Sequence, residues 1–438
     1  METILVYSER NNPRLDYILE HLTHLIENAH FKKCQTLEEY LSFEGVSINY
    51  SQQVVKVNEL WIQDKGFLNF NIQQTLVNLN ETIVNGIPVI FSLDSPNSYP
   101  HDLFAAAFWL LSRAEEYGIH DVDIHERFQS SHSWCAKVNC LNKPIVDSWI
   151  SNFLLNINSM FKRQFKLESK RFIWSIGIDI DHAWKYINKP SLNNGLGFIR
   201  DLLTMRFTKA LERGQVLLGI KKDPFDTYSL FKQLNLAPDQ IIFFILSGGN
   251  SAYDKNVPLS NDKMKQLILD LKKFYQIGLH PSYNTYRNKK MLHQEKSNLE
   301  KIVLTPITKS RQHYLRLKFP DTYHYLTESG ILEDYTMGYP DVTGFRAGTC
   351  FPFYWYDLVN ERTTTLRVFP FCAMDRTLLT YNKKTPDQAF LTLQELSKTV
   401  KEYGGHFHMV WHNSSFDEHA EWKEWTTLFF KIVRDLKT

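Results

Sequence analysis

Two aspartates, Asp179 and Asp181, stand at the end of an apolar run that begins at Trp174. Residues two apart on a β-strand point to the same side, so both carboxylates would project from the end of one buried strand. Two such carboxylates repel each other and raise a pKa unless a cation joins them. The spacing therefore predicts the chemistry of a metal-dependent hydrolase, with one carboxylate as a metal ligand and the other as a base. A surface turn or a helix cap formed by the same pair is the alternative.

Polar side chains also follow the other strands that the sequence predicts. From residue 172 onward, short apolar runs alternate with helical stretches, which indicates a parallel sheet that is either open or closed into a barrel. Functional groups in such folds collect at the carboxyl ends of the strands. The expected strands are 172–180, 241–246, 276–279, 302–305, 344–346, 367–371 and 406–411. The chemically capable residues that end or follow these strands are Asp179, Asp181, His280, His313, Arg346, Asp375 and His412.

A chain of 438 residues is too long for one ordinary domain. We expect residues 1–165 to form a smaller N-terminal α/β domain and residues 166–438 to carry the strand and helix alternation. Expected helices include 12–28, 102–117, 144–165 and 195–218. The second of these helices ends in Arg113, Glu115 and Glu116, which we interpret as an ion-pair network at a helix end or a domain interface.

Composition argues against several classes of protein. The 50 Lys and Arg residues nearly balance the 48 Asp and Glu residues, so a net charge of +2 gives no sign of a nucleic-acid binder. The five cysteines form no paired framework, and we expect reduced thiols rather than disulfides or a zinc knuckle. No apolar run has the length of a transmembrane segment, and the N-terminus lacks the pattern of a signal peptide. We therefore expect a cytoplasmic protein.

The order of the motifs resembles that of the polysaccharide deacetylase (NodB-homology) superfamily of metal-dependent carbohydrate esterases. The motifs that carry the resemblance are Asp179-Ile180-Asp181, Phe243-Phe244, Gly278-Leu279-His280-Pro281-Ser282, Gly344-Phe345-Arg346-Ala347 and Trp411-His412. The segment from Phe108 to Tyr117 is similar to an extension that precedes this domain in some bacterial members, notably from Bacteroidetes. The resemblance implies a distorted (β/α) barrel of about seven parallel strands, preceded by a smaller α/β domain.

One departure from the family pattern concerns the metal ligands. The family's second motif carries two histidines four residues apart, whereas Asn284 follows His280 at that distance. Because Asn is a weaker zinc ligand than imidazole, we favour His313 as the third ligand beside Asp181 and His280. Asn284 itself, His182 and a site that has lost its metal are the alternatives. The expected metal is zinc, with cobalt, nickel or manganese as other choices.

The resemblance also implies catalytic roles. Asp179 would take a proton from water, and Arg346 would pair with Asp179 and orient it. His412 would protonate the leaving group. Asp375 is a candidate partner for the imidazolium of His412, and a helix cap before Arg376 is the other interpretation of Asp375.

Aromatic residues near the motifs fit a sugar substrate, because aromatic rings can stack on the faces of pyranose rings. The candidates are Tyr283, Tyr314, Tyr335 and Trp355. Packing inside the barrel and its loops is the alternative role for these side chains.

The resemblance, together with these residues, implies a hydrolase that removes acetyl groups from an N- or O-acetylated sugar or glycan. An inactive sugar-binding or scaffold protein, and an amidase acting on a non-sugar C–N bond, are the competing functions. The expected partner is a sugar or glycan, with no nucleic acid and no transmembrane segment. For a protein inside the cell, a small or lipid-linked sugar is a more accessible substrate than a mature wall polymer. The sequence does not specify an oligomeric state.

Overall fold

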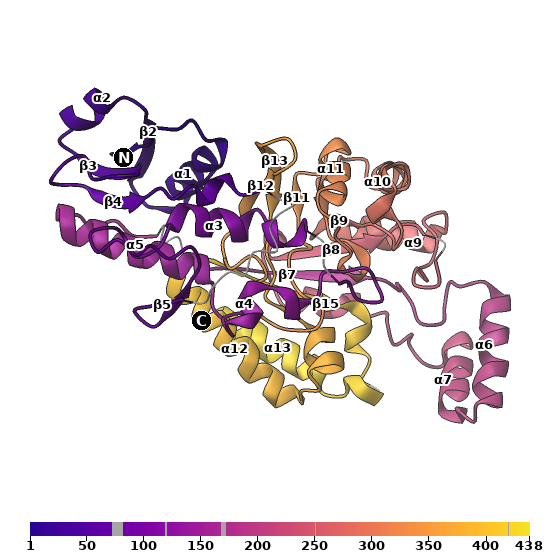
Figure 1. Cartoon of the computed structure of the whole chain (residues 1–438). Coiled ribbons are helices and arrows are strands. Elements are labelled where there is room, and N and C mark those ends of the chain that lie inside the picture. The colour runs from indigo at the N-terminus through magenta and orange to yellow at the C-terminus, as the bar shows by residue number, and fades with distance from the viewer. Residues whose placement is uncertain (72–81, 119–120, 168–171, 250, 419) are drawn as a thin grey trace.

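Two largely parallel sheets organise the chain (Figure 1). The computed structural model describes residues 1–71, 82–118, 121–167, 172–249, 251–418 and 420–438. The smaller sheet consists of β1 (Glu2–Tyr7), β2 (Ala29–Cys34), β3 (Val46–Ser51) and β4 (Leu60–Gln63). Its strand order is β2-β1-β3-β4, and all its pairs are parallel.

Five helices accompany the smaller sheet. They are α1 (Pro13–Leu25), α2 (Leu37–Ser42), α3 (Leu103–Leu111), α4 (Trp134–Lys137) and α5 (Ile145–Phe161). A short antiparallel hairpin of β5 (Thr82–Val84) and β6 (Ile87–Val89) precedes α3. Every residue of α3 is buried, because this helix contacts α1, α5 and the larger sheet. A helix that is apolar on all sides requires such an environment.

The larger sheet carries the strand-end residues that the sequence singled out. Its strands are β7 (Ile173–Ile180), β8 (Ile241–Leu246), β9 (Gln276–His280), β10 (Lys309–Ser310), β11 (Glu333–Asp334), β12 (Phe353–Asp357), β13 (Arg362–Val368), β14 (Ala373–Met374) and β15 (His406–His412). The order is β12-β13-β11-β10-β9-β8-β7-β15-β14, and β12 pairs antiparallel with β13 while the other pairs are parallel. Asp179 near the end of β7 is in register with His412 of β15. Neighbouring strands therefore end together at the edge where the site lies.

The segment between β13 and β14 forms backbone hydrogen bonds at both ends of the parallel part of the sheet, first beside β11 and then beside β15. The backbone N–H of Phe369 donates to the carbonyl of Asp334, and that of Phe371 donates to the carbonyl of Met337. The next N–H, that of Cys372, donates to the carbonyl of His408 on β15. The strand order itself is open at both edges and does not show a closed barrel.

The helices of the larger sheet follow its strands. They are α6 (Ser191–Leu203), α7 (Phe207–Leu217), α8 (Tyr228–Lys232), α9 (Asp262–Lys272), α10 (Lys289–Val303), α11 (Asp321–Glu328), α12 (Pro386–Tyr403) and α13 (Trp425–Leu436). Helices α6 and α7 project away from the sheet as a hairpin (Figure 1). The sequence predicted one helix over 195–218, and this prediction is wrong because the chain turns at residues 204–206, where Met205 has a positive φ.

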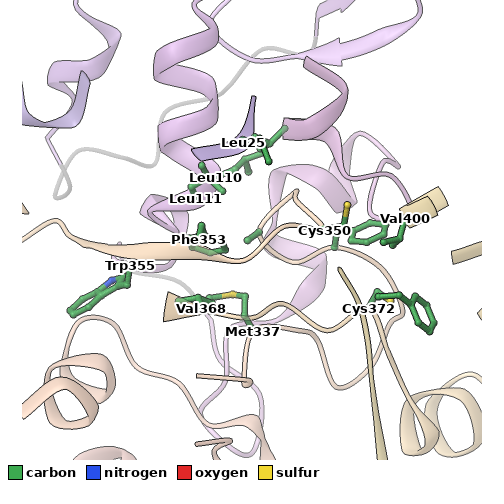
Figure 2. Packing of buried hydrophobic residues seen from close by; sticks show 14 of the residues in the cluster. Leu25, Leu110, Leu111, Met337, Cys350, Phe353, Trp355, Val368, Cys372 and Val400 are labelled. Atoms are coloured by element: carbon green, nitrogen blue, oxygen red, sulfur yellow. The ribbon is translucent and has the colours of Figure 1, made fainter. Parts of the chain in front are cut away.

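One apolar core extends from the N-terminal helices into the larger sheet. Figure 2 shows Leu110 and Leu111 of α3 close to Phe353 of β12, and all three belong to the same buried cluster. The five cysteines are all free and buried. Among the described helices, none combines the length and the apolar character needed to cross a bilayer.

Two of the predicted strands are wrong. Residues 302–303 are the end of α10, and the strand that follows them is β10. Residues 344–346 form a bend, in which the N–H of Phe345 donates to the carbonyl of Leu141. A Cβ on Gly344 would lie 2.2 Å from that same carbonyl oxygen, so the close approach of the two chains requires glycine.

Candidate active site

Asp181, His280 and His313 meet at the carboxyl end of the larger sheet. Asp181 follows β7, His280 ends β9, and His313 lies just after β10. One ligand atom from each residue lies within 4.8 Å of the other two. Nε2 of His280 is 3.2 Å from Oδ1 of Asp181, and Nε2 of His313 is 3.7 Å from the same oxygen. The three residues converge because parallel strands end at a common edge.

The donor set of this cluster fits a divalent cation. Oδ1 of Asp181 is buried and accepts no hydrogen bond from the described residues, although a buried anionic oxygen demands a partner. One carboxylate and two imidazoles match a catalytic zinc site, which keeps its fourth position open.

The charges within the cluster also favour a bound cation. Burial raises the pKa of Asp181, but the facing histidines, His313 first and then His280 and His412, outweigh burial and hold this pKa well below its usual range. Burial lowers the pKa of His313, yet Asp181 and Asp254 raise it to about 9. A centre that attracts a proton so strongly offers a favourable place for a metal cation.

A hydrogen-bond partner at Nδ1 fixes the orientation of both His313 and His280. Nδ1 of His313 lies 3.0 Å from Oδ1 of Asp254. Asp254 in turn accepts hydrogen bonds from the Ser251 hydroxyl and from the N–H of Tyr283, at 2.6 and 3.0 Å. Nδ1 of His280 donates to a backbone carbonyl. These contacts leave Nε2 of each imidazole directed at Asp181, as is typical of metal-binding histidines.

Asp179 is held by Arg311. This aspartate is buried, and its Oδ2 lies 3.9 Å from Nε2 of His280. Nη1 of Arg311 donates to Oδ1 of Asp179 at 2.8 Å. The guanidinium crosses β7 at Gly177, where a Cβ would lie 2.2 Å from Nη1. Glycine at 177 is therefore required for the contact.

A polar chain continues from Arg311 into the centre of the sheet. Arg311 can only donate, so Nε2 of His408 accepts its Nη2–H and Nδ1 of His408 carries the proton. That N–H donates to the Ser175 hydroxyl, which donates to Nε2 of His406, at 2.6 and 2.7 Å. Burial, followed by the charge of Arg311, lowers the pKa of His408 well below its usual value.

Arg346 does not pair with Asp179, and this prediction needs correction. The Arg346 guanidinium binds the Glu116 carboxylate with Nε to Oε1 at 2.9 Å and Nη2 to Oε2 at 2.5 Å. Glu116 also pairs with Arg113, whose αL backbone follows the end of α3. Because residues 344–346 bend toward the N-terminal block, Arg346 joins the predicted ion-pair network there instead of entering the site.

His412 and Asp375 form a buried pair. Oδ1 of Asp375 lies 2.8 Å from Nδ1 of His412, and Oδ2 accepts the N–H of His412 at 2.7 Å. Asp375 also accepts the N–H of the adjacent residue, Arg376. Burial lowers the pKa of His412, but Asp375 and Asp181 raise it to about 9. Nε2 of His412 lies 3.7 Å from Oδ2 of Asp181 and is directed at the metal cluster.

A cavity of about 340 Å³ opens at the metal cluster. Asp179, Asp181, His280, His313 and His412 all line it, together with Arg127, His182, Tyr253, Gln312, Tyr314, Leu315, Pro340, Met374, Arg376, Thr380, Tyr381 and Ser414. The N-terminal block contributes Arg127, which donates to the carbonyl of Tyr314 at 2.9 Å.

The remaining predicted residues lie in different places. Tyr314 lines the cavity. Tyr283 does not line it, and its ring stacks on the ring of Tyr253, a lining residue, with the ring centroids 4.3 Å apart. Tyr335 packs on other aromatic rings below the sheet end, and Trp355 is buried against α11, so neither of these two residues lines the cavity. Tyr335 and Trp355 therefore have the alternative role of packing inside the structure.

Asn284 is exposed and begins a short 3₁₀ turn. It does not line the cavity. His182 does line it, but its Nδ1 faces the carbonyl of Lys255. Of the candidates for a third ligand, His313 is the residue that the structure groups with Asp181.

Several site residues were missed in the sequence. Arg311 lies two residues before His313, so its position after an expected strand signalled it as clearly as it signalled His313. Asp254 lies in the loop after β8, eight residues beyond the end of that strand, so its position gave a weaker signal. Arg127 carried no signal, because it belongs to the N-terminal block and reaches the cavity only through tertiary packing.

Comparisons with known proteins identify no function for the N-terminal block. A model of a family of unknown function (DUF7033) matches residues 4–162, which is less than half of the chain. A search of curated proteins found no match.

Solved structures of deacetylases show a weak likeness. A Mycobacterium smegmatis structure with a provisional assignment as a polysaccharide deacetylase is 14% identical, with a TM-score of 0.38, and the match covers 61% of this chain and 85% of that one. The Bacillus cereus polysaccharide deacetylase is 10% identical with a TM-score of 0.30, and the match covers 60% and 88%. A CE4 family pseudoenzyme from Bacillus anthracis is 10% identical with a TM-score of 0.31, and covers 66% and 77%. Likenesses at this level do not support an argument about function.

Proposed function

We propose that this protein is a metal-dependent hydrolase that removes acetyl groups from an N- or O-acetylated sugar or glycan. One observation carries the proposal: the cluster of Asp181, His280 and His313 shares a cavity with Asp179 and with the His412–Asp375 pair. A metal site, a carboxylate base and an imidazole acid are the groups that hydrolysis of an amide or ester needs.

Asp181, His280 and His313 would hold the metal, with zinc as the first choice. When bound, such an ion supplies Lewis acidity, which lowers the pKa of a water ligand and polarises the substrate carbonyl.

Asp179 would accept a proton from the attacking water. Its Oδ1 is occupied by the bond from Arg311, which leaves Oδ2 on the side of His280 for the water. Arg311 is a positioning residue, since its hydrogen bond to Oδ1 restricts the rotation of the carboxylate.

His412 would donate the proton that the leaving nitrogen or oxygen requires. The hydroxyl of water bonds to the acyl carbon, the bond from that carbon to the leaving atom breaks, and the leaving atom takes the proton from Nε2. Asp375 fixes Nδ1 of His412, so the donating nitrogen faces the cavity.

Gln312 offers a further contact to the substrate. Its side chain is buried and lines the cavity, and its Nε2 has no hydrogen-bond partner among the described residues. This amide is a donor for a substrate oxygen. Tyr314 and Tyr381 on the cavity wall provide faces for a sugar ring.

A barrel-like closure of the larger sheet and the domain boundaries are also part of this proposal. The hydrogen bonds of Phe369, Phe371 and Cys372 support a distorted barrel, in which residues 362–374 act as one long strand between β11 and β15. The division into domains 1–165 and 166–438 remains a prediction, and the family-model match to residues 4–162 supports it. A cytoplasmic location also remains a prediction, which cell fractionation tests.

The test combines metal analysis with an assay of acetate release. Purified protein is analysed for bound metal, stripped with chelator, and reloaded with zinc or cobalt. A tetrahedral site with cobalt gives visible absorption that reports the ligands without any substrate. Acetate release is then measured on N-acetylated and O-acetylated sugars, with Asp179→Asn as the inactive variant and His293→Ala, on the exposed surface, as the control.

The competing functions give different results in this test. A protein that binds neither metal, and releases no acetate from any sugar, would be the inactive sugar-binding protein. Metal binding without release from sugars, but with cleavage of a non-sugar amide, would identify the amidase. The inactive interpretation was motivated by Asn284, and the position of His313 beside Asp181 and His280 supports the metal-binding interpretation instead.

A further inference from the structure

The hairpin of α6 and α7 is built with its polar side chains inside. The buried residues of α6 are Asn194 and Asp201, and α7 buries Arg213 against them. Nη2 of Arg213 donates to Oδ2 of Asp201 at 2.8 Å, and Nη1 donates to Oδ1 of Asn194 at 3.2 Å. Gly197 makes room for this guanidinium, since a Cβ there would lie 2.7 Å from Nη1. The two helices are therefore held together by a polar seam.

The outer surface of the hairpin is apolar. Six of its large apolar side chains have exposed fractions between 54 and 79%, namely Leu192, Leu196, Ile199, Leu203, Phe207 and Leu211. Those on α6 recur at intervals of three or four residues and share one side of the helix. Helices in water normally bury such a stripe and expose their polar residues. A contiguous exposed apolar surface of this kind marks an interaction site.

Cations border this apolar surface. Residues 191–222 contain six Lys or Arg residues and two Asp or Glu residues, a net charge of +4 against +2 for the whole chain. Arg206 and Lys209 are exposed, and both line a cavity of about 350 Å³ beside the hairpin. This cavity shares Arg376 and Ser414 with the candidate active site, so the hairpin lies beside a cavity that adjoins that site.

We propose that the α6–α7 hairpin docks the protein on the surface of an anionic phospholipid bilayer. The exposed leucines would enter the interfacial layer, while Arg206 and Lys209 would lie at the level of the lipid phosphates. Exposed apolar residues combined with a basic rim are the properties of helices that lie in a membrane interface. Contact with a second copy of the chain is disfavoured, because it would bring two surfaces of net charge +4 together.

Docking has a consequence for the substrate, which rests on the proposed function. The mouth of the cavity would lie close to the lipid surface, where a lipid-linked acetylated sugar could reach it. The docking itself requires no hydrolase activity, so the two proposals can fail separately.

The test measures binding of the full chain to vesicles by co-sedimentation. Vesicles of phosphatidylcholine with phosphatidylglycerol are compared with vesicles of phosphatidylcholine alone, at low and high salt. We expect binding to the anionic vesicles that weakens at high salt. The triple variant Leu196→Ser, Ile199→Ser, Leu203→Ser should bind at least about tenfold more weakly, because it removes apolar side chains that would be buried in the bilayer interface.

Matched controls separate docking from general surface effects. The variant Leu41→Ser, Leu155→Ser, Leu391→Ser removes exposed leucines elsewhere and should bind as the parent does. Circular dichroism and thermal melting check that each variant is folded, which is expected because every substituted side chain is exposed.

The charged rim has its own pair of variants. Arg206→Glu with Lys209→Glu should abolish the preference for anionic vesicles, whereas Lys290→Glu with Lys398→Glu on other exposed surfaces should not.

Three results would overturn the proposal. The first is the absence of binding to anionic vesicles by the parent protein, and the second is equal binding by the hairpin variants. The third is a dimer in light scattering that the leucine triple variant converts to a monomer, which would assign the surface to a second copy. Loss of vesicle binding with unchanged acetate release from soluble sugars would leave the proposed hydrolase intact, and the reverse result would leave docking intact.

Discussion

Arg311 donates a hydrogen bond to Asp179 over 2.8 Å, although the two residues are 132 positions apart in the sequence. The contact exists because β10 and β7 belong to one sheet and Gly177 lets the guanidinium pass across β7. We propose that Arg311 has the orienting role that the resemblance implied for Arg346.

The two arginines provide a matched pair of substitutions. Arg311→Lys should lower kcat/KM by about 100-fold, because a misplaced base loses its alignment with water and substrate. Arg346→Lys should lower the melting temperature and leave kcat/KM of the folded enzyme close to the parent value, since Arg346 binds Glu116 outside the cavity. Steady-state kinetics and calorimetry on both variants check this, and a larger kinetic loss for Arg346→Lys would contradict it.

The third metal ligand is tested by metal affinity alone. His313→Ala should lose bound zinc, whereas Asn284→Ala should retain it, because Asn284 is exposed and outside the metal cluster. Asp254→Asn, which weakens the support of Nδ1 of His313, should reduce affinity by about 10–100-fold. Competition with a chromogenic chelator measures all three. Zinc retention by His313→Ala would return Asn284 or His182 to consideration.

The ion pair of Glu116 predicts how stability depends on pH. Burial raises the pKa of Glu116, but Arg346 and Arg113 outweigh burial and lower it to about 2, from an ordinary value of 4.5. A carboxylate with a depressed pKa in the folded state contributes stability above pH 4.5, and this contribution is lost as pH falls toward 2.

Glu116→Gln should therefore destabilise the protein at neutral pH by about 3 kcal/mol. Its difference from the parent should shrink as pH falls below 4.5. Urea unfolding at several pH values measures this difference, and a constant difference down to pH 3 would show that the pair is not linked to stability in this way.

Asp375 should control the alkaline side of the pH–rate profile. A general acid must be protonated, so activity falls as pH rises through the pKa of His412. Burial lowers this pKa, and Asp375 is the largest influence that raises it. Asp375→Asn should therefore move the alkaline limb to lower pH, and it should also lower kcat because Nδ1 loses its fixed partner. A pH–rate profile unchanged in shape would exclude His412 as the acid.

Gln312 is expected to act through its free amide. Gln312→Leu removes the unpartnered donor and should lower kcat/KM by about tenfold, the effect of one lost hydrogen bond to the substrate. Metal content should not change, because Gln312 is not part of the metal cluster. Gln294→Leu on α10 is the control, since this side chain is exposed. Equal kinetics for the two variants would show that the amide does not bind substrate.

The sequence by itself determined the features that depend on local pattern. Apolar runs of strand length predicted β7, β8, β9 and β15, because a buried parallel strand is apolar on both faces. These strands place Asp179, Asp181, His280 and His412 at strand ends. Because the carboxyl ends of parallel strands lie at one edge of a sheet, the four side chains were expected to lie close together.

Tertiary structure alone decided which partners these residues have. Arg311 and Arg346 both follow expected strands, and their local sequences do not distinguish them. The bend at residues 344–346 sends Arg346 to Glu116, while the pairing of β10 in the sheet brings Arg311 to Asp179 and His313 to Asp181. The physical reason is that hydrophobic periodicity is a property of neighbouring residues, whereas these ion pairs join segments more than a hundred positions apart. Only the packing of the sheet fixes the distances between them.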